Sequence, residues 1–193
     1  MKTQPKNPPV SPYLVILIGI LAVSTASIFI RFAQAEASSL TIAVYRLIIA
    51  ALALAPIALL RHREEIRGLS GKQWGIGLLA GAFLAVHFAA WISSLEFTSV
   101  ASSVVLVTTT PIWVALFAPF TIREAITRRI LSGMFLALIG TVVIGISDVC
   151  TFSPALACPP LNSFLGGKAM FGDLLALVGA WSAAGYIMAG RNL

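Results

Sequence analysis

Six long apolar segments constrain the fold of this chain more than any other feature of its sequence. Each is about 20 residues long, and an α-helix of that length crosses the hydrocarbon of a bilayer at a rise of about 1.5 Å per residue. A strand interpretation is excluded, because the segments are too long and show no apolar/polar alternation. The sequence therefore predicts an all-α membrane protein, a polytopic bundle with transmembrane helices at residues 13–33, 40–60, 74–95, 99–119, 129–147 and 171–190.

Composition favours lipid over water as the surrounding medium. Of the 193 residues, 59% are hydrophobic and 10% are charged, whereas about a quarter of the residues of a soluble domain are charged. The net charge of +6 does not indicate nucleic acid, because the basic residues lie at segment ends and form no patch with interleaved aromatics. We expect the lipid bilayer as a partner, and no nucleic acid.

The distribution of Lys and Arg predicts the orientation, since these residues accumulate in cytoplasmic loops. The first segment is not a signal peptide, because its apolar run is too long and more spans follow. We therefore expect a multi-pass protein of the cell (inner) membrane with a cytoplasmic N-terminus. That orientation puts ten of the 13 Lys and Arg residues in the cytoplasm: Lys2, Lys6, Arg61, Arg63, Arg67, Lys72, Arg123, Arg128, Arg129 and Arg191.

Cys150 and Cys158 share the predicted outer loop, 148–170. Disulfides form in oxidising compartments such as a bacterial periplasm, so the pair is compatible with a disulfide and with two unpaired thiols. The sequence has no Cys/His cluster at metal-ligand spacing. We expect no metal and no other cofactor.

A polar stripe follows the third segment. His87, Trp91 and Ser94 are spaced at i, i+4 and i+7 and so share one helix face. Polar groups in lipid normally face the bundle or a watery cavity, and we expect this stripe to border a substrate cavity. An ordinary imidazole titrates near neutrality, which suits substrate binding or proton exchange. The alternatives are a histidine satisfied by the backbone of another helix and an interfacial tryptophan.

Arg46 is a charged residue inside the second segment. A charge at the centre of a span costs about 2.5–3.5 kcal/mol, and less where the side chain reaches the interface. Three interpretations are compatible with the sequence: a side chain that extends to the outer interface, a structural contact with another helix, or a contact with an anionic substrate. We include Arg46 among the predicted cavity residues.

The fourth segment contains the stretch "VTTTPIW". Pro111 has no N–H, so the carbonyl of Val107 loses its usual partner and the helix tends to kink. The hydroxyls of Thr108 and Thr109 compensate for lost backbone bonds and are also predicted cavity groups. The kink is either a gate or an ordinary bend.

Two local patterns predict how the third segment begins and packs. Ser70 with Gln73 fits the capping-box spacing of a helix start. Gly77 and Gly81 form a GxxxG pair, which predicts the close approach of a neighbouring helix.

A weak internal repeat relates the first and sixth segments. "LIGILAVSTASIFIR" (17–31) and "LVGAWSAAGYIMAGR" (177–191) each have glycine third and arginine twelve positions later. The five spans between the two starts would invert the second copy, as in many transporters. A chance match between helices rich in small residues is the alternative.

Several pieces in order resemble the drug/metabolite transporter superfamily, specifically its EamA-type branch: "SIFIRFA", "LTIAVYRLIIAALAL", "SLEFTSVASSVVLVTTTPIWVALFAPFTIREAITRRILSGMFLALIGTVVI" and "GDLLALVGAWSAAGYIMAGR". The resemblance implies a ten-helix carrier with two inverted five-helix repeats. We therefore expect a chain truncated after its sixth helix. Its expected parts are a cytoplasmic segment (1–12), the first EamA-type repeat (13–147), an extracytoplasmic loop (148–170) and the start of the second repeat (171–193).

The resemblance implies a secondary transporter, and frequently an exporter, of small organic metabolites or amino-acid-like solutes by alternating access. The alternative is a truncated membrane protein that does not transport, or a half-carrier that needs a partner such as a second copy. An enzyme is not expected, because the sequence has no phosphate-cradling glycine loop and no Ser-His-Asp set. We therefore predict no catalytic residue.

Overall fold

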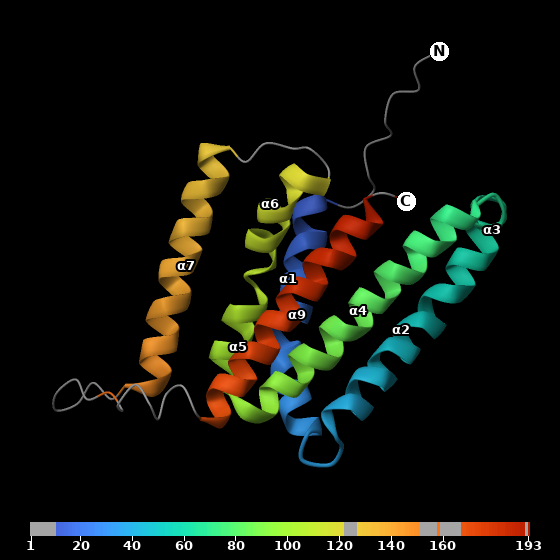
Figure 1. The fold of residues 1–193 in the computed structure, drawn as a ribbon. Coiled ribbons are helices and arrows are strands. Elements are labelled where there is room, and N and C mark those ends of the chain that lie inside the picture. Colours follow the sequence, from blue (N-terminus) through green and yellow to red (C-terminus); the bar gives the residue numbers. More distant parts are fainter. Residues whose placement is uncertain (1–10, 122–126, 151–157, 159–166, 192) are drawn as a thin grey trace.

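The computed structural model describes residues 11–121, 127–150, 158, 167–191 and 193. This part of the chain is helical apart from short connections, and it contains no strand. The helices are α1 (Pro12–Ala33), α2 (Ser39–Arg61), α3 (Arg63–Arg67), α4 (Gly71–Phe97), α5 (Val100–Val107), α6 (Thr110–Thr121), α7 (Arg128–Val149) and α9 (Lys168–Gly190) (Figure 1).

The predicted all-α polytopic membrane fold is confirmed. Among the described residues, 5 helical stretches are long and apolar enough to cross a membrane: Pro12–Ala33, Ser39–Arg61, Gly71–Phe97, Val100–Pro119 and Lys168–Gly190. Each coincides with a predicted segment. The other predicted segment, 129–147, falls within α7.

Serine side chains cap the starts of α2, α4 and α5. Ser38, Ser70 and Ser99 each accept a hydrogen bond from the backbone N–H three residues further along. At α4 the side chain of Gln73 also bonds back to the N–H of Ser70 and completes the predicted capping box. These bonds satisfy N–H groups that the first turn of a helix leaves without partners.

Helices α4 and α9 form the central pair of the described bundle (Figure 1). Helix α9 packs most extensively on α4 and also contacts α5 and α6. Helix α2 lies against α4, while α7 contacts α5 and α6. Helices α2 and α9 are far apart in the sequence, and both pack against α4.

Small residues on α9 make its close approach to α4 possible. A Cβ added at Gly172 would lie 2.8 Å from the backbone nitrogen of Thr98, and one added at Gly185 would lie 2.8 Å from the ring of Phe83. In lipid, small residues at an interface let helices pack by close van der Waals contact. The buried residues of α9 are Gly172, Ala176, Gly179, Ala180, Ser182, Ala184 and Met188.

Within the described residues no other helix approaches Gly77 or Gly81, so the packing role predicted for them stays a prediction. A Cβ at either position would meet nothing within 4 Å in the described part of the chain. Helix α4 meets α9 through the face that carries Phe83 and Trp91, while the glycines that receive them belong to α9. The small residues that permit close packing of α4 and α9 therefore lie on α9.

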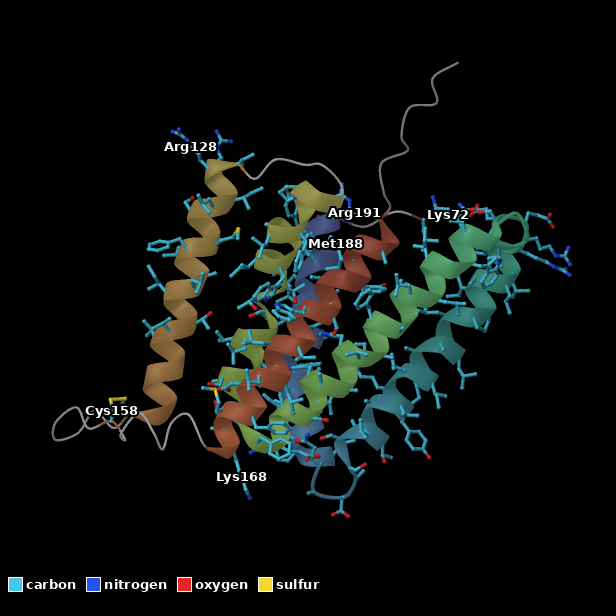
Figure 2. All side chains as sticks on the ribbon, in the orientation of Figure 1. Lys72, Arg128, Cys158, Lys168, Met188 and Arg191 are labelled. Carbon is cyan, nitrogen blue, oxygen red and sulfur yellow. A yellow bond between two sulfur atoms is a disulfide. The ribbon has the colours of Figure 1, made fainter. Side chains whose placement is uncertain are left out.

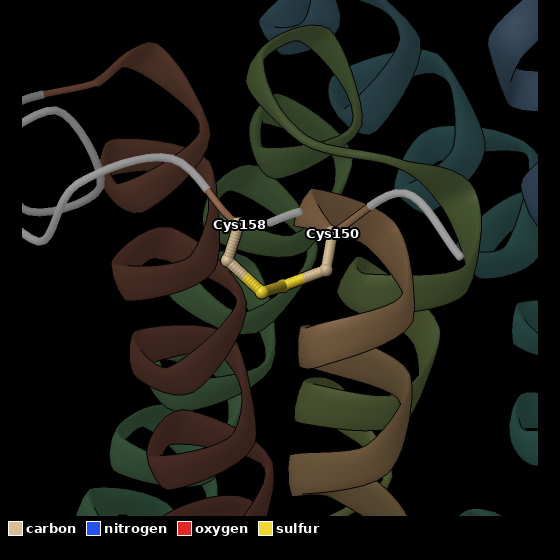
Figure 3. Close-up of a disulfide and its surroundings, with 2 residues drawn as sticks. All are labelled: Cys150 and Cys158. Atoms are coloured by element: carbon tan, nitrogen blue, oxygen red, sulfur yellow. A yellow bond between two sulfur atoms is a disulfide. The ribbon is translucent and has the colours of Figure 1, made fainter. Parts of the chain in front are cut away.

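The two ends of the bundle differ in charge (Figure 2). We call one the disulfide end, because it holds the α1–α2 connection, Lys168 and the bonded sulfur atoms of Cys150 and Cys158 (Figure 3). The other, called the basic end, holds α3 and the start of α7. Figure 2 labels Lys72, Arg128 and Arg191 at this end, and the bounds of α2, α3 and α7 add Arg61, Arg63, Arg67 and Arg129.

Hydrogen bonds at the disulfide end fix α1, α2 and α4 relative to one another. Gln34 Nε2 donates to the carbonyl oxygen of Ile92 at 2.8 Å and to Ser39 Oγ at 2.7 Å. The backbone N–H of Ser39 donates to the carboxylate of Glu96 at 3.2 Å, and its hydroxyl donates to the same oxygen. This network sets the register between α2 and α4, on which the candidate site depends.

Candidate functional site

The predicted stripe on α4 contacts three different helices. His87 meets α9, Ser94 meets α5, and Trp91 lies near Arg46 of α2. Trp91 is 7% exposed and Ser94 is 0% exposed, while His87 is half-buried. The stripe therefore faces the bundle, but its members have different surroundings.

His87 has the backbone contact that the sequence left as an alternative. Its Nδ1 lies 2.8 Å from the carbonyl oxygen of Gly179. A carbonyl only accepts, so Nδ1 carries the hydrogen, and Nε2 of the neutral ring is an acceptor. Glycine at position 179 permits this approach, because a Cβ there would lie 3.3 Å from Trp91 Cβ. The contact positions the ring between α4 and α9.

Ser94 lines no open space, so its predicted cavity role does not fit the structure. Its hydroxyl lies 2.6 Å from Ser103 Oγ and donates to the carbonyl of Trp91 at 2.7 Å. Both serines are 0% exposed. Because Ser94 donates its hydrogen to Trp91, Ser103 donates to Ser94 Oγ, and the pair is a buried polar link between α4 and α5.

Arg46 extends across to α4, where its guanidinium carbon lies over two aromatic rings. Its Cζ lies 5.0 Å from the ring centroid of Phe88 and 5.9 Å from that of Trp91. Arg46 lies about 10 Å along α2 from Ser39, and the two rings lie about 9–14 Å from the end of α4, at about 1.5 Å per residue. The side chain therefore runs sideways at constant depth, and it does not extend to the interface.

The aromatic contacts provide neither a hydrogen-bond acceptor nor a counterion for the guanidinium of Arg46. Among the described residues, it has neither a hydrogen bond nor an ion pair. A charge in a span costs about 2.5–3.5 kcal/mol, and a cation–π contact returns about 0.5–2 kcal/mol. The ring contacts thus hold the guanidinium in place but offset only part of the free-energy cost of a charge in the span.

An open groove runs beside Arg46. Its volume is about 680 Å³, and it lies along α1 and α2. Small-molecule pockets commonly measure about 300–1,000 Å³. Apart from Arg46, the walls are mostly apolar and consist of Ile30, Ala37, Thr41, Ile42, Tyr45, Ile49, Ala50 and Ala53.

The fourth predicted segment is interrupted at Thr108 and Thr109, which separate α5 from α6. The N–H of Thr109 donates to the carbonyl of Leu106, and the hydroxyl of Thr108 donates to the carbonyl of Val105 at 2.9 Å. These bonds satisfy backbone oxygens that the break exposes. Thr108 and Thr109 thus serve the backbone, and no groove described above contains them.

Pro111 follows the interruption at the second position of α6. It has no N–H to offer Val107, and the hydroxyl of Thr110 donates to that carbonyl at 2.8 Å. Trp113 Nε1 donates to Thr109 Oγ1 at 3.1 Å and holds the first turn of α6 against the break.

Sequence reasoning missed the residues that complete the site. Phe88 provides the nearer ring for Arg46, and its position next to His87 gave no signal because apolar residues surround it. Gln34 and Glu96, at helix ends, anchor the helices that hold the site. Their polarity at the end of a span was the available signal.

This arrangement defines a class: a polytopic α-helical membrane protein with a charged side chain held inside the bundle beside an open groove. Residues 10–146 match the model of the EamA-like transporter family, and the chain belongs to that family. The family is one of membrane transporters, so the predicted resemblance is confirmed.

One curated relative is an uncharacterized transporter from Archaeoglobus fulgidus. The two are 24% identical over 182 residues, which is 94% of this chain and 57% of the relative. The chain thus spans little more than half the length of that relative. No solved structure matches the chain.

Proposed function

We propose that the protein is a secondary transporter that exports small organic metabolites or amino-acid-like solutes across the cell (inner) membrane by alternating access. The observation that carries the proposal is Arg46, a charged residue inside a membrane-spanning helix and beside a groove of about 680 Å³. Ionisable residues within spans usually belong to a solute or ion path. Membership of a transporter family supports the same function.

The separation of charge between the two ends supports an orientation. Basic residues near span ends accumulate on the cytoplasmic side, so the basic end is cytoplasmic in this proposal, together with the N-terminus. The disulfide end then faces an oxidising exterior, in which a disulfide is stable.

The central position of α9 supports its assignment to a second repeat. In this proposal residues 13–147 form the first five-helix repeat, the loop 148–170 connects the repeats, and α9 begins the second. Carriers built from inverted repeats bind solutes between the repeats near the middle of the membrane. The packing of α9 on α4, α5 and α6 is consistent with such an interface.

The test is solute exchange by the purified protein in lipid vesicles. Vesicles are loaded with unlabelled amino acids and organic acids, and each solute is then offered outside in radiolabelled form. We expect at least one solute to accumulate above the level of protein-free vesicles. Arg46→Gln should lower its initial rate about tenfold, the effect of losing about 1.4 kcal/mol of binding.

Arg63→Gln is the matched control, because it removes the same charge from the exposed helix α3. Its initial rate should stay within about twofold of wild type. Exchange that is equally fast in the wild type and in Arg46→Gln would contradict the role of Arg46. A complete absence of exchange across the panel would contradict the transport proposal.

A further inference from the structure

We propose that Arg46 is an anion anchor, and that its guanidinium binds the carboxylate of a small solute with an apolar body. The inference rests on the proposed transport function and adds the chemical class of the solute. The aromatic rings of Phe88 and Trp91 hold the guanidinium from one side, and the groove along α1 and α2 lies beside the same side chain.

The N–H donors of Arg46 have no acceptor among the described residues. A guanidinium has five N–H donors, and its carbon lies over the rings of Phe88 and Trp91, which offer no oxygen acceptor. In the part of the chain that the structure describes, no oxygen accepts from these donors. A guest that reaches Arg46 through the groove must therefore supply acceptors.

Trp91, one of the two rings beneath Arg46, carries a second donor without an acceptor. The indole of Trp91 is 7% exposed, and its Nε1 is buried with no hydrogen-bond partner among the described residues. Buried polar groups are normally paired. Among the described residues, the guanidinium and the indole beneath it therefore both lack an acceptor, a combination that favours an oxygen anion and disfavours a cation.

The carboxylates of neighbouring helices are already engaged elsewhere. Glu96 accepts from the backbone and hydroxyl of Ser39, and Asp173 accepts from the hydroxyl of Thr98 at 2.7 Å. Neither forms an ion pair with Arg46. The counterion of Arg46 is therefore absent from the described residues, and a bound solute supplies it in this proposal.

The geometry favours a planar carboxylate with an apolar body. Arginine binds carboxylates through two parallel N–H···O bonds. The groove walls near Arg46 are Ile42, Tyr45 and Ile49, which suit an aliphatic or aromatic body. A lipid phosphate offers similar oxygen chemistry, so the experiment must separate a solute from a headgroup.

The test is equilibrium binding to the purified full chain in a maltoside detergent, which carries no phosphate. The probes are phenylacetate, hexanoate and leucine, each compared with its own amide. We expect at least one acid to bind saturably and at least tenfold more tightly than its amide. Arg46→Gln should weaken that binding at least tenfold, and Arg63→Gln should keep it within twofold.

Two further variants keep the proposal testable if Arg46→Gln does not fold, as judged by size-exclusion chromatography. Arg46→Lys keeps the charge but loses the planar fork, and should weaken binding about threefold. Trp91→Phe keeps a ring but removes the N–H, and should weaken binding severalfold. Unchanged binding in both variants would overturn the proposal.

The remaining outcomes separate the possible sources of the anion and the two proposals. Arg46-dependent binding of phosphatidylglycerol, with no acid bound better than its amide, would assign Arg46 to a lipid headgroup and overturn the inference. Exchange of neutral solutes that is unaffected by Arg46→Gln would overturn the inference and leave transport standing. Arg46-dependent acid binding without any exchange would support the inference and contradict transport.

Discussion

Single hydroxyl groups replace missing backbone donors within a membrane-spanning segment of this bundle. In hydrocarbon, an unpaired carbonyl has no water to bond, so the break between α5 and α6 needs side-chain donors. Thr108 donates to the carbonyl of Val105, and Thr110 donates to that of Val107. The run of three threonines before Pro111 therefore has a structural explanation at the level of individual atoms.

At the residue scale, replacing Thr110 with valine should destabilise the protein. Thr110→Val keeps the shape but leaves the carbonyl of Val107 without a donor, at a cost of about 1 kcal/mol. The unfolding midpoint in detergent should fall by about 2–4 °C.

Thr25→Val is the matched control for this substitution. Thr25 is exposed on α1, and its hydroxyl bonds carbonyls that lie within a regular helix. Those carbonyls keep their backbone donors, so the midpoint should not fall. An equal fall in both variants would argue against a special role for Thr110.

At the scale of elements, the fit between α4 and α9 depends on which helix carries the small residues. Large side chains of α4, including Phe83 and Trp91, press against glycines of α9. Packing of this kind tolerates little added volume, because neighbouring atoms have no room to move. We therefore expect a glycine-to-alanine substitution to lower stability at a packed glycine of α9 but not at an open glycine of α4.

Gly172→Ala should destabilise the bundle, whereas Gly77→Ala should not. The added methyl at position 172 would lie 2.8 Å from the backbone nitrogen of Thr98, and overpacking of this kind costs about 1–3 kcal/mol. At position 77 the methyl meets nothing within 4 Å, and alanine favours a helix over glycine by about 1 kcal/mol. Unfolding midpoints of the two variants in one detergent provide the measurement; a lower midpoint for Gly77→Ala than for Gly172→Ala would contradict the packing described.

The sequence predicted the helices better than it predicted their contacts. Helix positions follow from the length of apolar runs and from local caps such as Ser70 with Gln73, both of which are properties of a single segment. A GxxxG pair shows that a helix has a smooth face, but it does not say which helix covers that face. The glycines that pack against α4 are Gly172, Gly179 and Gly185. They are seven and six residues apart, so they do not form a GxxxG motif, whose glycines are four residues apart.

The candidate site was predictable in part for the same reason. His87, Trp91 and Arg46 were recognisable as polar groups in apolar helices. Their roles depended on neighbours from other helices: Gly179 for His87, and Phe88 for Arg46. Ser94 has the same polarity and the same helix face, yet its partner Ser103 removes it from any open space.

For the whole molecule, the separation of charge is the property on which the proposed orientation in the membrane rests. The basic end collects side chains from α2, α3, α4, α7 and the end of α9, which are distant in the sequence (Figure 2). Positive charges near span ends are retained on the cytoplasmic side during insertion. The proposed orientation therefore predicts that the two ends react differently with reagents that do not cross the membrane.

Cysteine labelling tests this orientation directly, because the chain has 2 cysteines and both lie at the disulfide end. After intact cells are treated with an impermeant reductant, an impermeant maleimide should label Cys150 or Cys158; without the reductant, labelling should be weak. In a cysteine-free background, Arg63→Cys at the basic end should react only after the cells are permeabilised. The reverse pattern, with the native cysteines protected in intact cells and position 63 labelled, would place the basic end outside, because a membrane-impermeant reagent reaches only the exposed face.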